Sequence, residues 1–412
     1  KRMSSTRDRS ILRDLAETYK AVATRPEQVE IRDLWRRHNS LKKTRPLAFV
    51  RGGKAFQHEV PAINDLQCDD PFARQLERRF REQLFMASLG DDRVFNPWLT
   101  LRAVYTCCGW GVDVPREHAG DDLTAWKADY PLKTLDDLGK LRMPRHGVDE
   151  KKTRESRERA EDLVGDILPV NIDRGPAYRS FAGDLSTSLH YLRGIENFMM
   201  DMLDNPEGLH RLAAFLRDGI LRTHDQAEAA GDWGGDCHDN QAMPYAEELP
   251  DPAPNVHGVE RNQLWYFAAA QEFAGVGPDM HDEFLLQYQL PILSKFGLVA
   301  YGCCEDLTNK IDMLRQIPNL RRIAVTPWAD VARCAEQIGT DYVISWRPSP
   351  TEMVCTDFRP DRVRRITREA LAACRGLHVD ITLKDIQTVQ HEPDRLREWV
   401  AITKEVAEAT LP

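Results

Sequence analysis

Short apolar runs alternate with helical patterns throughout the last third of the chain, and this alternation constrains the fold more than any other feature. The apolar runs cover residues 298–301, 322–326, 342–346 and 377–383. Helical patterns lie between them at residues 307–316, 329–338 and 360–375, and a final helix is expected at residues 394–409. Strands that alternate with helices at this spacing are parallel and are joined by helical crossovers.

The number of such units favours a closed barrel over an open doubly wound sheet. Upstream, residues 167–172 form another apolar run, and residues 265–272 are interpreted as a strand or loop that carries a carboxylate. No Gly-x-Gly-x-x-Gly turn marks a dinucleotide-binding fold. We therefore expect an α/β fold, with a (β/α)8 TIM barrel at residues 111–412 and an N-terminal helical extension packed on it at residues 1–110.

Composition excludes several classes of protein. A net charge of -9 argues against nucleic acid as a partner, because phosphate binding needs clustered cations. No stretch reaches the roughly 18 uninterrupted apolar residues of a transmembrane helix, and no secretory signal follows the charged N-terminus. The nine cysteines, which include the adjacent pairs Cys107–Cys108 and Cys303–Cys304, are typical of reduced thiols. We therefore expect a cytoplasmic protein.

Two adjacent thiols and two carboxylates, from Cys303 to Asp306, follow the apolar run at residues 296–302. Successive side chains of a strand point to opposite faces, so at most one thiol faces a given pocket while the chain stays extended. A thiolate beside carboxylates at the end of a strand suits a metal site or an acid/base pocket. The alternative is that both cysteines are small hydrophobic residues of the core.

Polar residues after the other apolar runs are further candidates, because the active site of a barrel lies at the C-terminal ends of its strands. The candidates for acid/base catalysis are Glu272, Lys384 and Asp385. The candidates for substrate binding are Trp328, Trp346, Arg347 and, in a long polar loop at residues 231–258, His238. The alternatives are a surface ion pair for Arg347, a solvated turn at Lys384 and core packing for the tryptophans. No serine nucleophile elbow, phosphate loop or His-Glu-x-x-His motif is present.

Several segments resemble the uroporphyrinogen decarboxylase superfamily, in particular its corrinoid-linked methyltransferase-like branch. The matching segments are residues 133–141, 191–201 with 205–207, 278–280 with Tyr288, and 297–303. The Leu-Arg-Gly-x-Glu-Asn sequence at residues 192–197 is fairly specific to this superfamily. The resemblance covers roughly residues 130–410 and implies a (β/α)8 barrel with its pocket at the strand ends.

The resemblance also implies a metal. Methyltransferases of this branch bind zinc through a His-x-Cys at this strand end and a later Cys. Cys303 matches the first Cys, but Tyr301 stands where the His is expected, and Lys384 lies in the region of the later Cys. Zinc would therefore need substitute ligands, and it accepts sulfur, nitrogen and oxygen donors. With Cys303, the candidates are Glu272 and Glu305, and Asp385 and His238 are the alternatives.

The function implied by the resemblance is that of a methyltransferase or demethylase component. It would move a methyl group from a small-molecule donor to a thiol or to a partner protein that carries a corrinoid, assisted by zinc. Related barrels often pair, so a homodimer is compatible with the resemblance. The alternatives are a metal-independent decarboxylase or lyase of the same barrel family and a non-catalytic ligand-binding homologue. Heme biosynthesis is not expected, because the N-terminal arginine motif of the decarboxylase has no match.

Overall fold

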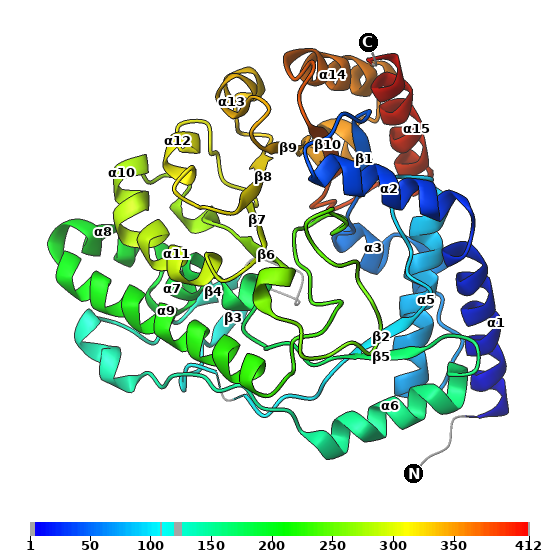
Figure 1. Cartoon of the computed structure of the whole chain (residues 1–412), viewed down its shortest axis with the longest axis horizontal. Coiled ribbons are helices and arrows are strands. Elements are labelled where there is room, and N and C mark those ends of the chain that lie inside the picture. Colours follow the sequence, from blue (N-terminus) through cyan, green and yellow to red (C-terminus); the bar gives the residue numbers. More distant parts are fainter. Residues whose placement is uncertain (1–4, 108, 119–125, 411–412) are drawn as a thin grey trace.

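The largest sheet of the protein has six parallel strands in the order β1-β10-β9-β8-β7-β6. The structure is a computed structural model that describes residues 5–107, 109–118 and 126–410, so Cys108 lies outside the described residues (Figure 1). The strands of the main sheet are β1 Leu47–Val50, β6 Trp265–Ala268, β7 Leu298–Tyr301, β8 Leu320–Val325, β9 Val343–Trp346 and β10 Val379–Leu383. Two further parallel strands pair with each other, β2 Leu99–Arg102 and β5 Val170–Asp173, and β3 Arg116–His118 pairs antiparallel with β4 Trp126–Ala128.

Helices surround these strands, and α11, α13 and α15 pack directly against the main sheet (Figure 1). The α-helices are α1 Thr6–Ala23, α2 Glu27–Asn39, α3 Lys54–His58, α4 Pro61–Asn64, α5 Pro71–Leu89, α6 Glu150–Val164, α7 Leu185–Arg193, α8 Ile195–Asp204, α9 Pro206–Ala229, α10 Pro278–His281, α11 Gln287–Leu293, α12 Ile311–Leu314, α13 Val331–Ile338, α14 Pro360–Ala373 and α15 Asp394–Ala409. Short 3-10 or π turns are η1 Leu135–Lys140, η2 Ser180–Gly183, η3 Arg261–Gln263, η4 Gln271–Phe273, η5 Asp282–Leu286 and η6 Thr351–Cys355.

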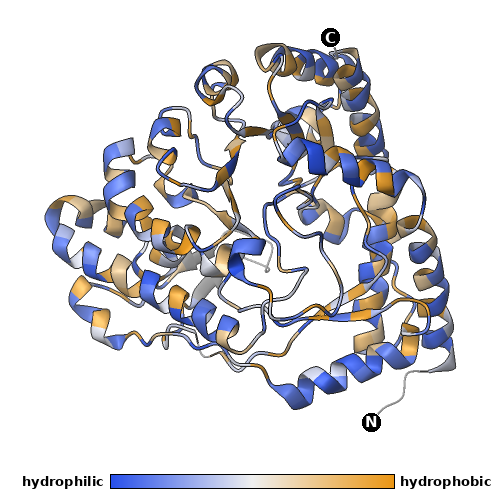
Figure 2. Cartoon of the chain, in the orientation of Figure 1, coloured by the Kyte–Doolittle hydropathy of each residue, from blue (hydrophilic) through white to orange (hydrophobic). Residues whose placement is uncertain are grey.

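The strands of the main sheet lie in the core. Every residue of β1, β6, β7, β9 and β10 is buried. Parallel strands that are covered on both faces have continuous apolar sequences, which is why the runs in the last third could be recognised. The four strands and the helical crossovers predicted there are confirmed, although α12 is shorter than the predicted helix. Figure 2 shows hydrophobic and hydrophilic residues alternating along the surrounding helices, as expected for helices with one face against a core.

The N-terminal segment contributes strands as well as helices. Helices α1, α2 and α5 lie in this segment, as expected for a helical extension. Helix α5 begins at Pro71 after the N-cap Asp70 and ends at Gly90, which has a φ of 73°. However, β1 pairs in parallel with β10 along its whole length, and β2 pairs with β5. Residues 1–110 are therefore not a purely helical extension, because two of their segments are strands of the parallel sheets.

A buried ionic network ties α2 to the main sheet. Asp380 of β10 accepts hydrogen bonds from Arg322 of β8 at 2.7 Å and from Ser345 of β9 at 3.0 Å. Its carboxylate also lies 3.1 Å from Nε2 of His38, at the end of α2. All four side chains are buried. Three strands and one helix therefore share a single carboxylate.

The structure also bears on two predictions from the sequence, the absence of a transmembrane helix and the reduced state of the cysteines. No helix in the described ranges is long and apolar enough to cross a membrane. The eight cysteines that the structure describes are all free thiols.

Candidate functional site

Charged and nucleophilic side chains gather where four strands of the main sheet end. Arg51 directly follows β1, Arg347 follows β9 and Lys384 follows β10, while Cys303 lies two residues beyond β7. The C-terminal ends of parallel strands lie at the same edge of a sheet, which is where ligands of α/β proteins bind. We refer to these four residues, together with Cys304, as the thiol site.

A tight turn after β7 positions the thiol pair. Gly302 has a φ of 101°, and an added Cβ would lie 2.7 Å from the Leu307 side chain and 2.9 Å from Cβ of Ala324. Beyond it, the buried Glu305 carboxylate accepts hydrogen bonds from the backbone N–H groups of Cys303 at 2.8 Å and Cys304 at 2.9 Å. Its other oxygen accepts one from the backbone of Ala270 at 2.7 Å, after β6. Glu305 therefore organises the backbone that carries the two thiols.

We expect Gly302→Ala to destabilise the protein by more than about 3 kcal/mol, because it adds steric overlap in the core to backbone strain. Gly376→Ala is the matched control, since Gly376 has a φ of 79° but no atom within 4 Å of an added Cβ. Strain alone should cost this control about 1–2 kcal/mol. Denaturant unfolding measures both values. Equal losses would show that the turn can relax around an added methyl group.

The two sulfur atoms lie 3.5 Å apart, and the Lys384 ammonium group lies between 3.1 and 3.5 Å from both. Arg347 donates a hydrogen bond to the Cys303 carbonyl at 2.7 Å. The hydrogen bond from Cys304, together with the charges of Lys384 and Arg347, lowers the pKa of Cys303 to about 6, although burial opposes this. The pKa of Cys304 is raised by its hydrogen bond to Cys303, by burial and by the negative charge of Cys303. The pair therefore holds one thiolate and one thiol at neutral pH.

The cations around the thiolate are themselves unusual. Burial opposes the charge of Lys384, but the Cys303 thiolate raises its pKa above the ordinary value. Burial and the like charge of Arg347 lower the pKa of Arg51, so the two guanidinium groups are held near each other. Asp385, beside Lys384, has a φ of 56°, a conformation that non-glycine residues rarely adopt outside functional or strained sites. Lys384 forms an ion pair with Asp385 at 2.5 Å, so its charge is already matched. Among the described residues no carboxylate is recorded within 4.0 Å of the Arg51 or Arg347 guanidinium group, so these two are the cations available to an anionic ligand.

The donor set at the thiol site does not fit zinc. Lys384 already places a cation against both sulfur atoms, and the Glu305 oxygens are engaged by backbone N–H groups. Glu272 lies after β6 and bonds to Ser186 instead. Within the described ranges, no group of three His, Cys, Asp or Glu ligand atoms lying within 4.8 Å of one another includes Cys303. We therefore assign no metal to the thiol site.

Three of the residues predicted to bind substrate lie away from the thiol site. Trp328 is 78% exposed after β8. Trp346 is buried in the main hydrophobic cluster. Its side chain points to the opposite face of the sheet from that of Arg347, because successive side chains of an extended chain alternate between the two faces. His238 accepts a hydrogen bond at 3.3 Å from the backbone of Trp265, which begins β6, so it lies near the opposite end of the strand from Cys303. Burial lowers its pKa to about 4, so it is neutral.

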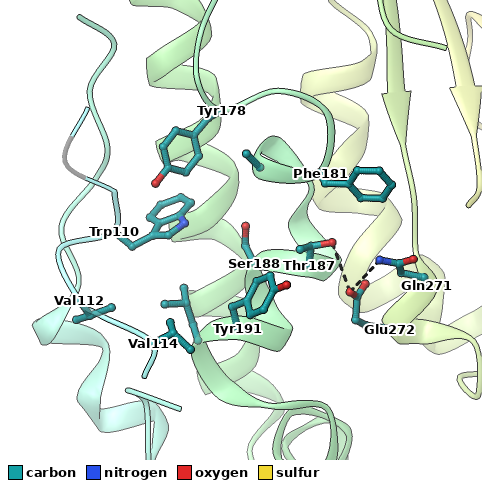
Figure 3. Close-up of a pocket in the computed structure, with 12 residues that line it drawn as sticks. Trp110, Val112, Val114, Tyr178, Phe181, Thr187, Ser188, Tyr191, Gln271 and Glu272 are labelled. Carbon is teal, nitrogen blue, oxygen red and sulfur yellow. Dashed lines mark hydrogen bonds between the residues drawn. The ribbon is translucent and has the colours of Figure 1, made fainter. Parts of the chain in front are cut away.

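A cavity of about 500 Å³ is lined by residues from the segments that follow β2, β5 and β6 (Figure 3). No residue of the thiol site lines it, but Phe267 contacts the lining residue Phe181 and shares a hydrophobic cluster with Cys303. Glu272 lies at its edge and interacts with the Ser186 hydroxyl at 2.5 Å. The same hydroxyl lies 3.0 Å from Asp184, whose pKa is raised to about 7 by burial and by the charge of Glu272. Sequence reasoning missed Asp184 and Ser186, although an Asp just before a helix is a recognisable N-cap, and Asp184 does cap α7.

A second cluster of ligand-type atoms lies around the end of β5. Oxygen or sulfur atoms of Asp173, Asp236 and Cys237 lie within 4.8 Å of one another. Arg179 forms an ion pair with Asp173, and Asn171 donates a hydrogen bond to Asp236 at 2.5 Å. Burial raises the pKa of Cys237 to about 12, so it is a thiol. Because Arg179 already supplies positive charge to this cluster, we assign no metal to it.

A comparison with models of known protein families finds no match to this chain, and a comparison with curated proteins finds none either.

Proposed function

We propose that this protein is a methyltransferase-type enzyme in which the Cys303 thiolate accepts a methyl group from a small-molecule donor. The observation that carries the proposal is the thiol pair itself, which is held against Lys384 at a strand end and retains one negative charge at neutral pH. The thiolate is the reactive form of cysteine, and a lowered pKa makes it available at neutral pH.

A closed (β/α)8 barrel is part of the proposal. Two features support it: the first and last strands of the chain, β1 and β10, pair with each other, and eight parallel strands alternate with helices. On the other edge of β1, the side chains of Asp91 and Asp92 accept hydrogen bonds from the backbone of Val50 and Ala48, both at 2.8 Å. These carboxylates, just before β2, occupy positions where a neighbouring strand would pair.

The proposed transfer has two half-reactions. In the first, a bond forms between the Cys303 sulfur and the methyl carbon while the bond from that carbon to the donor heteroatom breaks, and the bonding pair leaves with the heteroatom. In the second, the methyl group leaves the sulfur, which recovers its thiolate. The acceptor brings its own electron pair and is either a small thiol or a partner protein that carries a corrinoid. Arg347 and Arg51 hold an anionic part of the substrate.

A test of methyl transfer uses three donor classes: methylated amines, methyl thioethers and aryl methyl ethers. The protein is incubated at pH 7 with each donor, and the peptide that contains Cys303 is analysed by mass spectrometry. We expect one donor class to add a single methyl group to Cys303, which is then lost on addition of a reduced corrinoid or a small thiol. The proposal fails if no donor methylates the wild type, or if Cys303→Ser turns a donor over at the wild-type rate.

A metal-independent decarboxylase or lyase is the second candidate. Arg51 and Arg347 favour it, since they would hold a substrate carboxylate, and the donor set does not fit zinc. Release of carbon dioxide from a carboxylated substrate, at equal rates in the wild type and in Cys303→Ser, would favour this candidate over methyl transfer. Tight ligand binding without either product would favour the non-catalytic alternative.

A further inference from the structure

Four of the twelve described residues that line the cavity of about 500 Å³ are aromatic, and the others are four aliphatic residues, three neutral polar residues and Glu272. Trp110 lies with its ring centroid 5.5 Å from that of Tyr178, and the Tyr191 ring also lines the cavity (Figure 3). Phe181 completes the aromatic lining and remains 37% exposed. Exposed aromatic faces around a concave space of this size are typical of small-molecule sites.

The charge of the cavity is distinctive. Glu272 is the one charged side chain among the described residues that line it. The structure records no lysine, arginine or histidine within 4.0 Å of the Glu272 carboxylate, in the ranges it describes. Its recorded partners are the neutral groups of Ser186, Thr187 and Gln271. An anionic ligand is therefore disfavoured in the cavity, in contrast to the thiol site.

A buried hydroxyl group lies between Glu272 and a second carboxyl group, that of Asp184. A single Ser186 hydroxyl contacts both Glu272 and Asp184, yet it has one hydrogen to donate. One of the two carboxyl groups must therefore supply a proton for both contacts to be hydrogen bonds. Burial and the neighbouring Glu272 carboxylate raise the pKa of Asp184 to about 7, so Asp184 holds a proton more readily than an ordinary aspartate.

Aromatic faces combined with one uncompensated carboxylate are the chemistry that recognises alkylated ammonium groups. A cation is attracted to the face of an aromatic ring, and quaternary ammonium ions are bound by cages of such rings. We infer that this cavity binds a methylated ammonium group and that an N-methylated amine is the methyl donor. The second part of this inference rests on the proposed methyl transfer at Cys303.

The position of the cavity agrees with such a donor. Phe181 packs against Phe267 of β6 with ring centroids 5.2 Å apart, and Phe267 shares a small hydrophobic cluster with Cys303. A quaternary ammonium donor also needs no acid catalyst. When the thiolate takes the methyl carbon, the carbon–nitrogen bond breaks, the bonding pair stays on nitrogen and a neutral amine leaves. Atoms and charges balance without a proton, which is consistent with the absence of a basic side chain from the described lining.

Calorimetric titration with choline and with its neutral isostere, dimethylbutanol, tests the ammonium site directly. The two molecules have the same shape and differ in one positive charge. We expect the wild type to bind choline at least about tenfold more tightly than the isostere. Glu272→Gln should weaken choline binding about tenfold and leave binding of the isostere unchanged, and Trp110→Leu should also weaken choline binding. Equal affinity of the wild type for both molecules would overturn the inference and define a neutral apolar site.

The matched control is Asp279→Asn, which removes an exposed carboxylate near Glu272 in sequence and should leave choline binding unchanged. Weakening by this control equal to that of Glu272→Gln would mean that general surface charge, rather than the cavity, attracts the ligand. The outcomes separate the two proposals. Choline binding without methylation of Cys303 by any donor would retain the ammonium site and reject methyl transfer. Methylation of Cys303 by a thioether or ether donor without choline binding would retain methyl transfer and reject the ammonium site.

Discussion

Lys384→Met is expected to lower the rate at which methyl iodide alkylates Cys303 at pH 7 by about tenfold or more. The ammonium group lies 3.5 Å from the Cys303 sulfur and 3.1 Å from the Cys304 sulfur. Removing this buried charge raises the pKa of the thiol pair, so the reactive thiolate becomes a minor species at neutral pH. Mass spectrometry of the peptide that contains Cys303, sampled over time, measures the rate at this one site.

Lys384→Arg is the matched control, because it keeps the positive charge and should retain most of the rate. The stability of each variant is measured in parallel, since Lys384 is largely buried. An unchanged alkylation rate in a folded Lys384→Met protein would mean that Arg347 and Arg51 alone stabilise the thiolate. Lys384 would then have no part in activating Cys303.

Asp380→Ala is expected to lower the free energy of unfolding by about 3–5 kcal/mol, because it leaves the Arg322 guanidinium buried without its carboxylate. Burial opposes the charge of Asp380, but Arg322 and His38 lower its pKa to about 2. The ordinary pKa of an aspartate is about 4, so this stabilisation is complete above about pH 4. It is lost as the pH falls from there toward 2. Denaturant unfolding at pH 7 gives the main value.

Asp361→Ala is the control for this variant. Asp361 lies fully exposed and pairs with Arg364 at 3.1 Å, and such surface pairs contribute less than about 1 kcal/mol. A loss at Asp380 no larger than the loss at Asp361 would show that the interior of the sheet tolerates an unpaired arginine. The ionic network that joins α2 to β8, β9 and β10 would then contribute little to the free energy of unfolding.

The last third of the fold could be predicted because its strands are buried on both faces. Their sequences are therefore short apolar runs separated by amphipathic helices. β1 gives a much weaker signal, since its four apolar residues lie between two helical patterns. β2 is harder still, because two of its four residues are polar. Pairing of β1 with β10 joins segments more than 300 residues apart, and no local pattern records such a contact.

The thiol site could be predicted in part for a geometric reason. Cys303, Arg347 and Lys384 each follow a recognisable strand, and parallel strands bring such residues to one edge. Arg51 was missed because β1 was missed. The alternation of side chains along β9 could have separated Trp346 from Arg347, since adjacent residues point to opposite faces. The engagement of Glu305 by three backbone N–H groups could not be foreseen, because one of those groups comes from the turn after β6.

The metal ligands implied by the resemblance show where residue types alone are insufficient. Cys303, Glu272 and Glu305 are all plausible zinc ligands by chemistry. In the structure each of these groups has another partner. Lys384 donates a hydrogen bond to the Cys303 sulfur, the Ser186 hydroxyl contacts the Glu272 carboxylate, and backbone N–H groups bond to the Glu305 carboxylate. A lysine that follows the last strand supplies the positive charge beside the sulfur atoms. The assignment of zinc to these residues stays a prediction that the geometry does not favour.

A pH titration of ultraviolet thiolate absorbance tests most directly whether the Cys303–Cys304 pair carries a charge at neutral pH. The signal is the difference between the wild type and the double variant Cys303→Ser/Cys304→Ser, so that the cysteines outside the pair cancel. We predict that one thiolate appears with a midpoint near pH 6. A midpoint near pH 8.5, the ordinary value for cysteine, would contradict the account, because the thiol pair would then be protonated where the enzyme is proposed to work.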